Sequence, residues 1–338
     1  MAAPAVLRAQ PKTIKMGALR LVHSMPPFFY EKYAPEGVKI EIVMFDSPTD
    51  GKNAVVTKSV DFGTFGIAAA ILGGAAGEPM VVVGAMSNKG MGVISKAGSD
   101  MKTVKDLKGH KVGIWPGSTQ EVFIFERLKM EGMTVKDITP VRVPFGEMPA
   151  MLARGDIDAY VGAEPGPALS ITSGAGQLVE YPYGTAMGGL NMILGTHEET
   201  IAKNPDLVRT MLKIQRQAAE YMMANKPAVV DATVQKLGAN RAAVEQALRG
   251  KKAGNELLRL LGGRPIHATR DLGETTLAHV ADAVDECVER TEQRAAANAV
   301  ESIGLVGCRE IGRDATVHDS ALLDPDGSGL ELCGAGAG

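Results

Sequence analysis

Two short segments of the sequence could bind the polar head of a small molecule through hydroxyl and backbone N–H groups. In the first, Ser47 stands directly before a proline; in the second, Ser118 is followed three residues later by Glu121. Serine is a favoured helix N-cap, proline suits the first helical position, and serine with glutamate at that spacing forms a capping box. We therefore expect Ser47, Thr49, Ser118 and Thr119 near the positive ends of helix dipoles. Helix capping alone would also account for both serines.

A third candidate, Asn191, falls in an apolar segment predicted to be a strand, over residues 189–193. An amide side chain supplies both a hydrogen-bond donor and an acceptor, which suits a neutral ligand. A structural role at a hinge between two lobes is the alternative for this residue.

Signatures of catalytic, nucleotide and metal sites are missing from the sequence. The glycine-rich stretch at 73–77 lacks the Lys and Ser/Thr of a phosphate loop, and no Gly-x-Gly-x-x-Gly opens a helix after a strand. The sequence holds no His-Glu-x-x-His and no Gly-x-Ser-x-Gly, and His267, His279 and His318 are scattered. We expect no cofactor, no metal and no catalytic residue.

The elements that must position these residues alternate between short apolar runs and helix-length segments. This alternation predicts an α/β fold with mostly parallel sheets. The predicted strands cover residues 14–18, 38–44, 61–64, 80–85, 93–95, 111–114, 139–143 and 159–161. The predicted helices cover residues 26–33, 48–58, 67–75, 118–130, 147–154, 198–225 and 226–238.

This order of elements predicts two lobes joined by two crossing strands that form a hinge. Residues 12–95 together with 186–248 are expected to form lobe one, and residues 96–185 to form lobe two. A central cleft between two such lobes is the default place for a small ligand.

The overall composition is that of an ordinary globular protein. The chain has 338 residues, 45% hydrophobic and 22% charged, with a formal net charge of -3. This balance gives no reason to expect a nucleic-acid partner. No run of about 18 apolar residues occurs, so the sequence predicts no transmembrane helix. We expect a monomer.

Both ends of the chain depart from the pattern of the middle. Residues 1–11 are small and apolar, like the end of an export signal, or else form a disordered terminus. Residues 250–338 contain no Phe, Tyr or Trp, although the chain has eight Phe, six Tyr and one Trp. All three cysteines, Cys287, Cys308 and Cys333, also lie there. We expect 249–338 to be an atypical tail that is frame-shifted or disordered, or a divergent helical region.

Five segments of the middle of the chain together resemble one protein family. They are Phe-Asp-Ser-Pro-Thr-Asp-Gly at 45–51, Val-Asp-Phe-Gly-Thr-Phe-Gly at 60–66, Asp-Leu-Lys-Gly-His-Lys-Val-Gly at 106–113, Pro-Gly-Ser-Thr at 116–119 and Met-Leu-Ala-Arg-Gly-Asp-Ile-Asp-Ala at 151–159. Over residues 12–248 the chain resembles periplasmic solute-binding proteins of the nitrate, sulfonate and taurine type. That family also includes thiamine-pyrimidine binders and fungal pyrimidine synthases.

The resemblance implies the two-lobed type II periplasmic-binding-protein fold and adds five candidate ligand-binding residues. By family position, His23, Phe65, Gly66, Glu164 and Pro165 would face the cleft. A carboxylate there would repel a sulfonate or nitrate and favour an amine, amide or heterocycle. A surface or capped histidine is the ordinary alternative for His23.

The function implied by the resemblance is capture and delivery of a small molecule. We expect an exported, periplasmic component of an ABC importer, with its signal peptide truncated here, that binds a small polar molecule or oxoanion. Its partners would be a permease and that permease's ATPase, and it would not be an enzyme. The alternatives are a pyrimidine-synthase-like enzyme on the same fold, although residues 1–286 hold no cysteine, or a soluble ligand-sensing domain.

Overall fold

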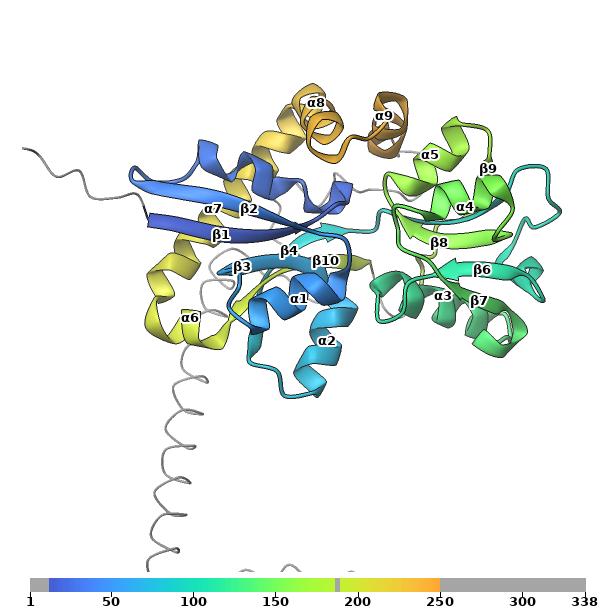
Figure 1. Cartoon of the computed structure of the whole chain (residues 1–338), viewed down its shortest axis with the longest axis horizontal. Helices are drawn as coiled ribbons and strands as arrows, with labels where there is room; N and C mark the ends of the chain where they lie inside the picture. The colour runs from blue at the N-terminus through green and yellow to red at the C-terminus, as the bar shows by residue number, and fades with distance from the viewer. Residues whose placement is uncertain (1–11, 186–188, 250–338) are drawn as a thin grey trace, which may run out of the picture. The chain divides into compact units, whose positions relative to one another are not determined.

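Two five-stranded sheets form the framework of the described part of the chain. A computed structural model describes residues 12–185 and 189–249, coloured along the chain in Figure 1. The expectations for residues 1–11 and for the tail from residue 250 lie outside the described residues. None of the helices in the described ranges is long and apolar enough to cross a membrane.

The first sheet has the strand order β2-β1-β3-β10-β4. Its strands are β1 (Lys12–Leu19), β2 (Val38–Phe45), β3 (Phe62–Gly66), β4 (Met80–Asn88) and β10 (Leu190–His197). β1 pairs in parallel with β2 and β3, whereas β10 is antiparallel to both β3 and β4. The carboxyl ends of β1, β2 and β3 therefore meet at one edge, where their loops can share a site.

The second sheet repeats this plan with the order β7-β6-β8-β5-β9. Its strands are β5 (Met91–Lys96), β6 (Lys111–Ile114), β7 (Thr139–Arg142), β8 (Ala159–Ala163) and β9 (Gly176–Glu180). β6 is parallel to β7 and β8, and β5 is antiparallel to β8 and β9. In each sheet four strands thus run in one direction and one strand, β10 or β5, runs against them, which agrees with the predicted α/β class.

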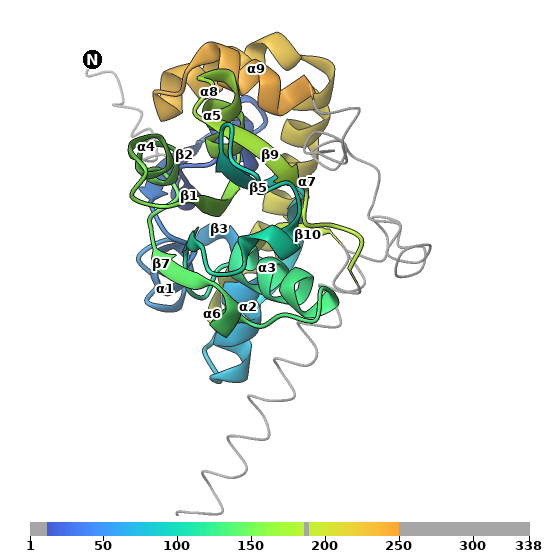
Figure 2. The ribbon, with the colours of Figure 1, turned by 90° about the vertical axis from the view of Figure 1, so that its right-hand side faces the viewer.

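Helices cover both faces of each sheet. In the first sheet, α1 (Pro48–Val56) and α2 (Ile67–Ala75) lie on the face opposite α7 (Pro205–Ala224); in the second, α3 (Thr119–Met130) lies opposite α4 (Met148–Arg154) and α5 (Gly166–Thr172) (Figures 1 and 2). The remaining helices are α6 (Glu198–Lys203), α8 (Lys226–Leu237) and α9 (Arg241–Arg249), with short 3-10 turns at Val22–Ser24, Pro26–Lys32, Val104–Leu107 and Val135–Asp137. α9 packs on α5 through the alanines Ala168, Ala243 and Ala247.

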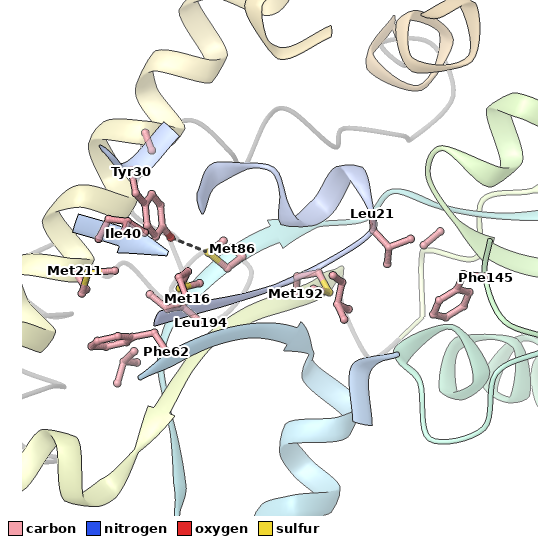
Figure 3. Packing of buried hydrophobic residues seen from close by; sticks show 14 of the residues in the cluster. Met16, Leu21, Tyr30, Ile40, Phe62, Met86, Phe145, Met192, Leu194 and Met211 are labelled. Atoms are coloured by element: carbon pink, nitrogen blue, oxygen red, sulfur yellow. Dashed lines mark hydrogen bonds between the residues drawn. The ribbon is translucent and has the colours of Figure 1, made fainter. Parts of the chain in front are cut away.

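The alternation of side chains along β10 explains how one strand serves two cores. Met192 and Leu194 point into the core beneath α7, while Ile193 points into the core beneath α1 and α2. A strand buried on both faces is apolar where it crosses the core, as β10 is at Met192, Ile193 and Leu194. Figure 3 shows the core on the α7 side, where Met16, Phe62 and Leu194 gather with Met211 of α7.

The chain changes sheets at Lys89 and Gly90, between β4 and β5. Both residues have positive φ angles, 56° and 77°, and the Lys89 N–H donates to the Gly189 carbonyl at 2.6 Å. β5 pairs with β8 and β9 and so belongs to the second sheet. The change of sheet therefore falls before the 95/96 division drawn from the sequence.

Several segments differ from the sequence-based expectation, and proline explains one of them. The predicted helix at 26–33 is a 3-10 helix, Pro26–Lys32. The predicted helix at 198–225 divides at Asn204, which caps α7 before Pro205. In addition, α5, β9 and α9 were not predicted.

A buried hydrogen bond ties the segment after β1 to helix α7. The Tyr30 hydroxyl donates to Gln215 Oε1 at 2.5 Å and lies 3.9 Å from Met86 Sδ, the latter contact drawn as a dashed line in Figure 3. Tyr30 is fully buried, and this burial raises the pKa of its phenol well above the usual value. The phenol therefore stays protonated and acts as the donor.

We expect Tyr30→Phe to lower the free energy of unfolding by about 1–3 kcal/mol, because it leaves the buried Gln215 oxygen without its donor. Urea unfolding followed by circular dichroism measures the change. Tyr33→Phe is the control, since Tyr33 is half-buried nearby, and should change stability by less than about 0.5 kcal/mol. Equal effects of the two substitutions would contradict the assignment.

Candidate functional site

The backbone carbonyl of Lys89, where the chain changes sheets, accepts hydrogen bonds from two of the predicted site residues. His23 Nε2 donates to this oxygen at 3.0 Å, and Asn191 Nδ2 donates to it at 2.8 Å. His23 follows β1, and Asn191 lies in β10. Strands far apart in sequence thus place two buried polar side chains on one acceptor, with His23 and Asn191 only 0% and 1% exposed.

His23 is a neutral imidazole in this setting. Burial lowers its pKa from 6.5 to about 4, although the carbonyls of Lys89 and Gly90 act in the opposite direction. A carbonyl oxygen can only accept, so the proton of the neutral ring sits on Nε2 and the lone pair on Nδ1. Among the described residues, neither His23 Nδ1 nor Asn191 Oδ1 has a hydrogen-bond partner.

Thr119, at the start of α3, lies against the start of α2. Its Oγ1 accepts from the Ala68 N–H at 3.4 Å and lies 3.4 Å from the Asn191 carbonyl, to which it can donate. These are long, weak hydrogen bonds. A Cβ atom on Gly66 would stand only 2.6 Å from Thr119 Oγ1, so only glycine lets the second sheet's helix approach this closely. The N-termini of α2 and α3 therefore meet beside Asn191.

Glu164 joins the same region through its backbone and carries a buried carboxylate. Its carbonyl accepts from the Val22 N–H at 3.1 Å, and its N–H donates to the Gly90 carbonyl at 3.0 Å. Its Oε2 accepts from the Ala168 N–H at 3.1 Å, and the residue is 2% exposed. Burial of Tyr181 raises the pKa of its phenol, and the negative charge of Glu164 raises it further.

The two predicted N-caps are confirmed as caps. Ser47 Oγ accepts from the Asp50 N–H at 3.1 Å and donates to Asp50 Oδ2 at 2.7 Å. Ser118 Oγ accepts from the Glu121 N–H at 3.2 Å, while Glu121 Oε2 accepts from the Gly117 N–H at 2.6 Å. In both helices an acidic residue of the first turn takes up donors at the positive end.

The remaining predicted residues lie less centrally. Thr49 is exposed in the first turn of α1, and Pro165 is half-buried beside Glu164, to which a cis peptide bond joins it. The Phe65 ring packs into the core with Val55 and Ile193 instead of lying with His23 and Asn191. The structure therefore brings together His23, Gly66, Thr119, Glu164 and Asn191, here called the junction cluster.

Sequence reasoning missed two polar residues at the end of β4 and one tyrosine. Ser87 Oγ and Asn88 Oδ1 are buried without a partner among the described residues. The Tyr183 hydroxyl accepts from the Met91 N–H at 2.5 Å. Polar residues after an apolar run are typical of an exposed turn, so the sequence carried no signal that β4 extends to Asn88.

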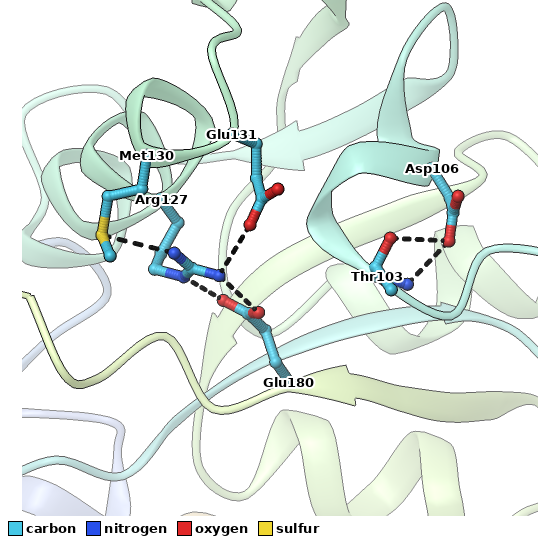
Figure 4. A network of polar contacts seen from close by, with 6 residues as sticks. All are labelled: Thr103, Asp106, Arg127, Met130, Glu131 and Glu180. Atoms are coloured by element: carbon cyan, nitrogen blue, oxygen red, sulfur yellow. Dashed lines mark hydrogen bonds and ion pairs between the residues drawn. The ribbon is translucent and has the colours of Figure 1, made fainter.

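Helix α3 is fixed by an ion pair far from its N-terminus. Arg127 donates to both carboxylate oxygens of Glu180 in β9, at 2.7 and 3.1 Å, and also to Glu131 (Figure 4). Arg127 is only 14% exposed as a side chain, and a two-pronged contact of this kind fixes orientation well. The pair thereby helps to position the Thr119 end of α3.

Comparison with known proteins gives one family match and several relatives. The family model described as "NMT1/THI5 like" matches residues 31–228. A putative aliphatic sulfonates-binding protein of Escherichia coli (strain K12) is 30% identical over 151 residues, 44% of this chain. A 4-amino-5-hydroxymethyl-2-methylpyrimidine phosphate synthase of Uromyces fabae is 30% identical over 161 residues, 45% of this chain. Each alignment spans 47% of the relative, so the chain matches about half the length of these curated relatives.

A solved structure shares the fold. The alkanesulfonate-binding protein SsuA from Xanthomonas axonopodis pv. citri, bound to MOPS, aligns with a TM-score of 0.62 and 22% identity. The alignment covers 71% of this chain and 84% of that protein. The two-lobed periplasmic-binding-protein fold expected from the sequence is therefore confirmed.

The close approach of Gly66 and Thr119 predicts a steric effect. Gly66→Ala should lower the free energy of unfolding by about 1–3 kcal/mol, because the new methyl group overlaps Thr119 Oγ1. Thr119→Ala should remove most of this cost, which a double-mutant cycle by urea unfolding measures. Gly74→Ala is the matched control on α2, where a Cβ meets nothing within 4 Å. If Gly66→Ala lowers the free energy of unfolding by the same amount in the Thr119→Ala background as in the unaltered chain, the two positions are not in steric contact.

The neutral, buried His23 predicts a dependence of stability on pH. The unfolded chain takes up a proton on this ring below about pH 6.5 and the folded chain only below about 4, so the unfolded state binds more protons between these values. The free energy of unfolding should therefore fall by about 3 kcal/mol, from this residue, as the pH falls from 6.5 to 4. Urea unfolding between pH 6.5 and 4 should show a smaller fall in the free energy of unfolding for His23→Gln than for the unaltered chain. His110→Gln, at a histidine whose side chain is 45% exposed, should keep the full fall of the free energy of unfolding. Identical pH profiles for all three chains would refute the assignment.

Proposed function

Because the chain belongs to the NMT1/THI5-like family, we propose that it is the solute-binding component of an ABC importer. The observation that carries this proposal is the junction cluster, in which buried polar groups from both sheets converge where the chain crosses between them. A cluster built from two sheets can recognise a ligand and report its presence through the relative position of the sheets.

The chemistry of the junction cluster suits binding. His23 and Asn191 each hold one polar atom without a partner in the described part of the chain, and such buried atoms gain free energy when a ligand pairs with them. Thr119 lies between backbone groups of Ala68 and Asn191, which belong to the first sheet's side. A ligand that contacts these residues would favour the arrangement in which the two sheets lie close.

Partners and location follow from the same proposal. The captured solute would pass to a permease driven by an ATPase, and the protein would act outside the cytoplasm as a monomer. The names of the Escherichia coli relative and of the Xanthomonas structure, both binding proteins for sulfonates, support a transport role. Ser47, Thr49, Ser118 and Pro165 remain proposed ligand contacts in addition to the junction cluster, whereas the ring of Phe65 lies in the core.

A second candidate is an enzyme, favoured by the 30% identity to the fungal pyrimidine phosphate synthase. Chemistry of that kind requires reactive side chains at the ligand. In this chain residues 1–286 contain no cysteine, and His23 Nε2 is committed to the Lys89 carbonyl. Binding without chemical change is therefore the stronger proposal.

The test is a solute screen that separates binding from conversion. Nitrate, taurine, alkyl and aryl sulfonates, pyrimidines, polyamines and aromatic acids are added to the purified chain, and thermal unfolding is followed. A solute at about 100 times its dissociation constant should add about 2.7 kcal/mol to stability. Mass spectrometry of the recovered solute should show an unchanged mass. A changed mass would establish the enzyme, and a chain that no solute stabilises would contradict both candidates.

A further inference from the structure

An arginine and the chain's one tryptophan lie together at the carboxyl end of the second sheet. Arg142, the last residue of β7, pairs with Ile114, the last residue of β6, and Trp115 follows Ile114 directly. The two strands are parallel neighbours, side by side in Figure 1. Ligands of α/β sheets bind outside the carboxyl ends of such strands. The Trp115 carbonyl accepts from the Ser118 N–H at 3.2 Å, in the turn that leads to Thr119 of the junction cluster.

The guanidinium group of Arg142 stacks on the ring of Trp115. Its Cζ atom lies 4.8 Å from the centre of the ring, within the range of a cation–π contact. Arg142 is exposed and Trp115 is half-buried. A guanidinium group whose face lies on a ring keeps its N–H donors at the rim of its plane. Stacking therefore holds this cation in place and leaves its donors for another partner.

Arg142 differs from the other arginines whose side chains the structure describes. Each of the others forms an ion pair with a carboxylate: Arg20, Arg127, Arg154, Arg209, Arg216 and Arg241. Within residues 12–185 and 189–249, no carboxylate forms an ion pair with Arg142, and Glu121 in the first turn of α3 accepts instead from the Gly117 N–H. The positive charge of Arg142 is thus oriented by an aromatic ring and is not neutralised by an acidic side chain of the described chain.

We propose that Arg142 and Trp115, here called the Trp–Arg subsite, bind an oxoanionic group that is attached to an apolar or aromatic body. The proposal rests on the proposed solute-binding function and adds two residues that determine its specificity. A carboxylate or sulfonate would accept two parallel hydrogen bonds from the guanidinium fork. The body of the solute would pack against the accessible part of the indole ring.

The single tryptophan makes the Trp–Arg subsite directly observable. Benzoate and benzenesulfonate are titrated into the unaltered chain, and benzamide and benzenesulfonamide serve as uncharged counterparts of similar size. Each probe is taken to about 10 mM, which saturates a site of millimolar affinity, while Trp115 emission and thermal unfolding are followed. At least one anion should change the emission along a saturable curve and raise the unfolding midpoint. Its uncharged counterpart should bind at least about tenfold more weakly, because it lacks the charge-assisted hydrogen bonds.

Substitutions of Arg142 test the role of its guanidinium group with the anion that binds. Arg142→Gln should weaken binding of that anion at least about tenfold, and Arg142→Lys should restore part of the affinity, because it keeps the charge but loses the fork. Arg154→Gln is the matched control, since the Arg154 side chain is 61% exposed and pairs with Asp156, and it should leave affinity unchanged. Arg142 is exposed, so its variants should keep the unfolding midpoint of the unaltered chain in the absence of the probe.

Three results would overturn the Trp–Arg subsite and leave the proposed binding function standing. They are equal affinity for an anion and its uncharged counterpart, unchanged affinity of Arg142→Gln for the anion, and stabilisation by an anion without any change in Trp115 emission. Failure of both anions to bind would overturn the subsite as well. The binding function itself fails only if no solute of the wider screen stabilises the chain.

Discussion

The backbone carbonyl of Lys89 holds together the segments that meet where the chain passes from one sheet to the other. It stands between β4 and β5, where the chain leaves one sheet for the other, and accepts hydrogen bonds from His23 and Asn191. The left-handed backbone at Lys89, with φ of 56°, turns the chain there at an energetic cost that these bonds help to offset. The connection between the sheets is therefore also the place where polar groups of three segments meet.

The sheet topology explains why this meeting occurs at the junction. The parallel strands β1, β2 and β3 end at one edge of the first sheet, and β6, β7 and β8 do the same in the second. Antiparallel β10 and β5 return the chain through both sheets beside those ends. Loops at strand ends tolerate polar residues, whereas the strands between them are apolar because helices cover both faces.

The local parts of this arrangement could be predicted from the sequence, and the long-range parts could not. Ser47 and Ser118 were predicted as caps because capping depends on residues only three apart. The convergence of His23 and Asn191 depends on the register of β10 against β4, which is irregular around Met192 and leaves no trace in residue spacing. Phe65 was predicted to face the ligand from family position, but its ring fills the room left by Gly195 in the core.

Acidic residues in the first turn of a helix affect both the stability of the helix and its attraction for an anionic ligand. An acidic side chain in the first turn stabilises the helix by facing its positive end, and by doing so it reduces the attraction for an external anion. Asp50 and Glu121 do this in α1 and α3, and each adds the hydrogen bonds of a cap. The first turn of α2 has no acidic residue, so no such charge faces its positive end. The helix ends of one fold therefore differ in what they offer a ligand, according to a few residues of each first turn.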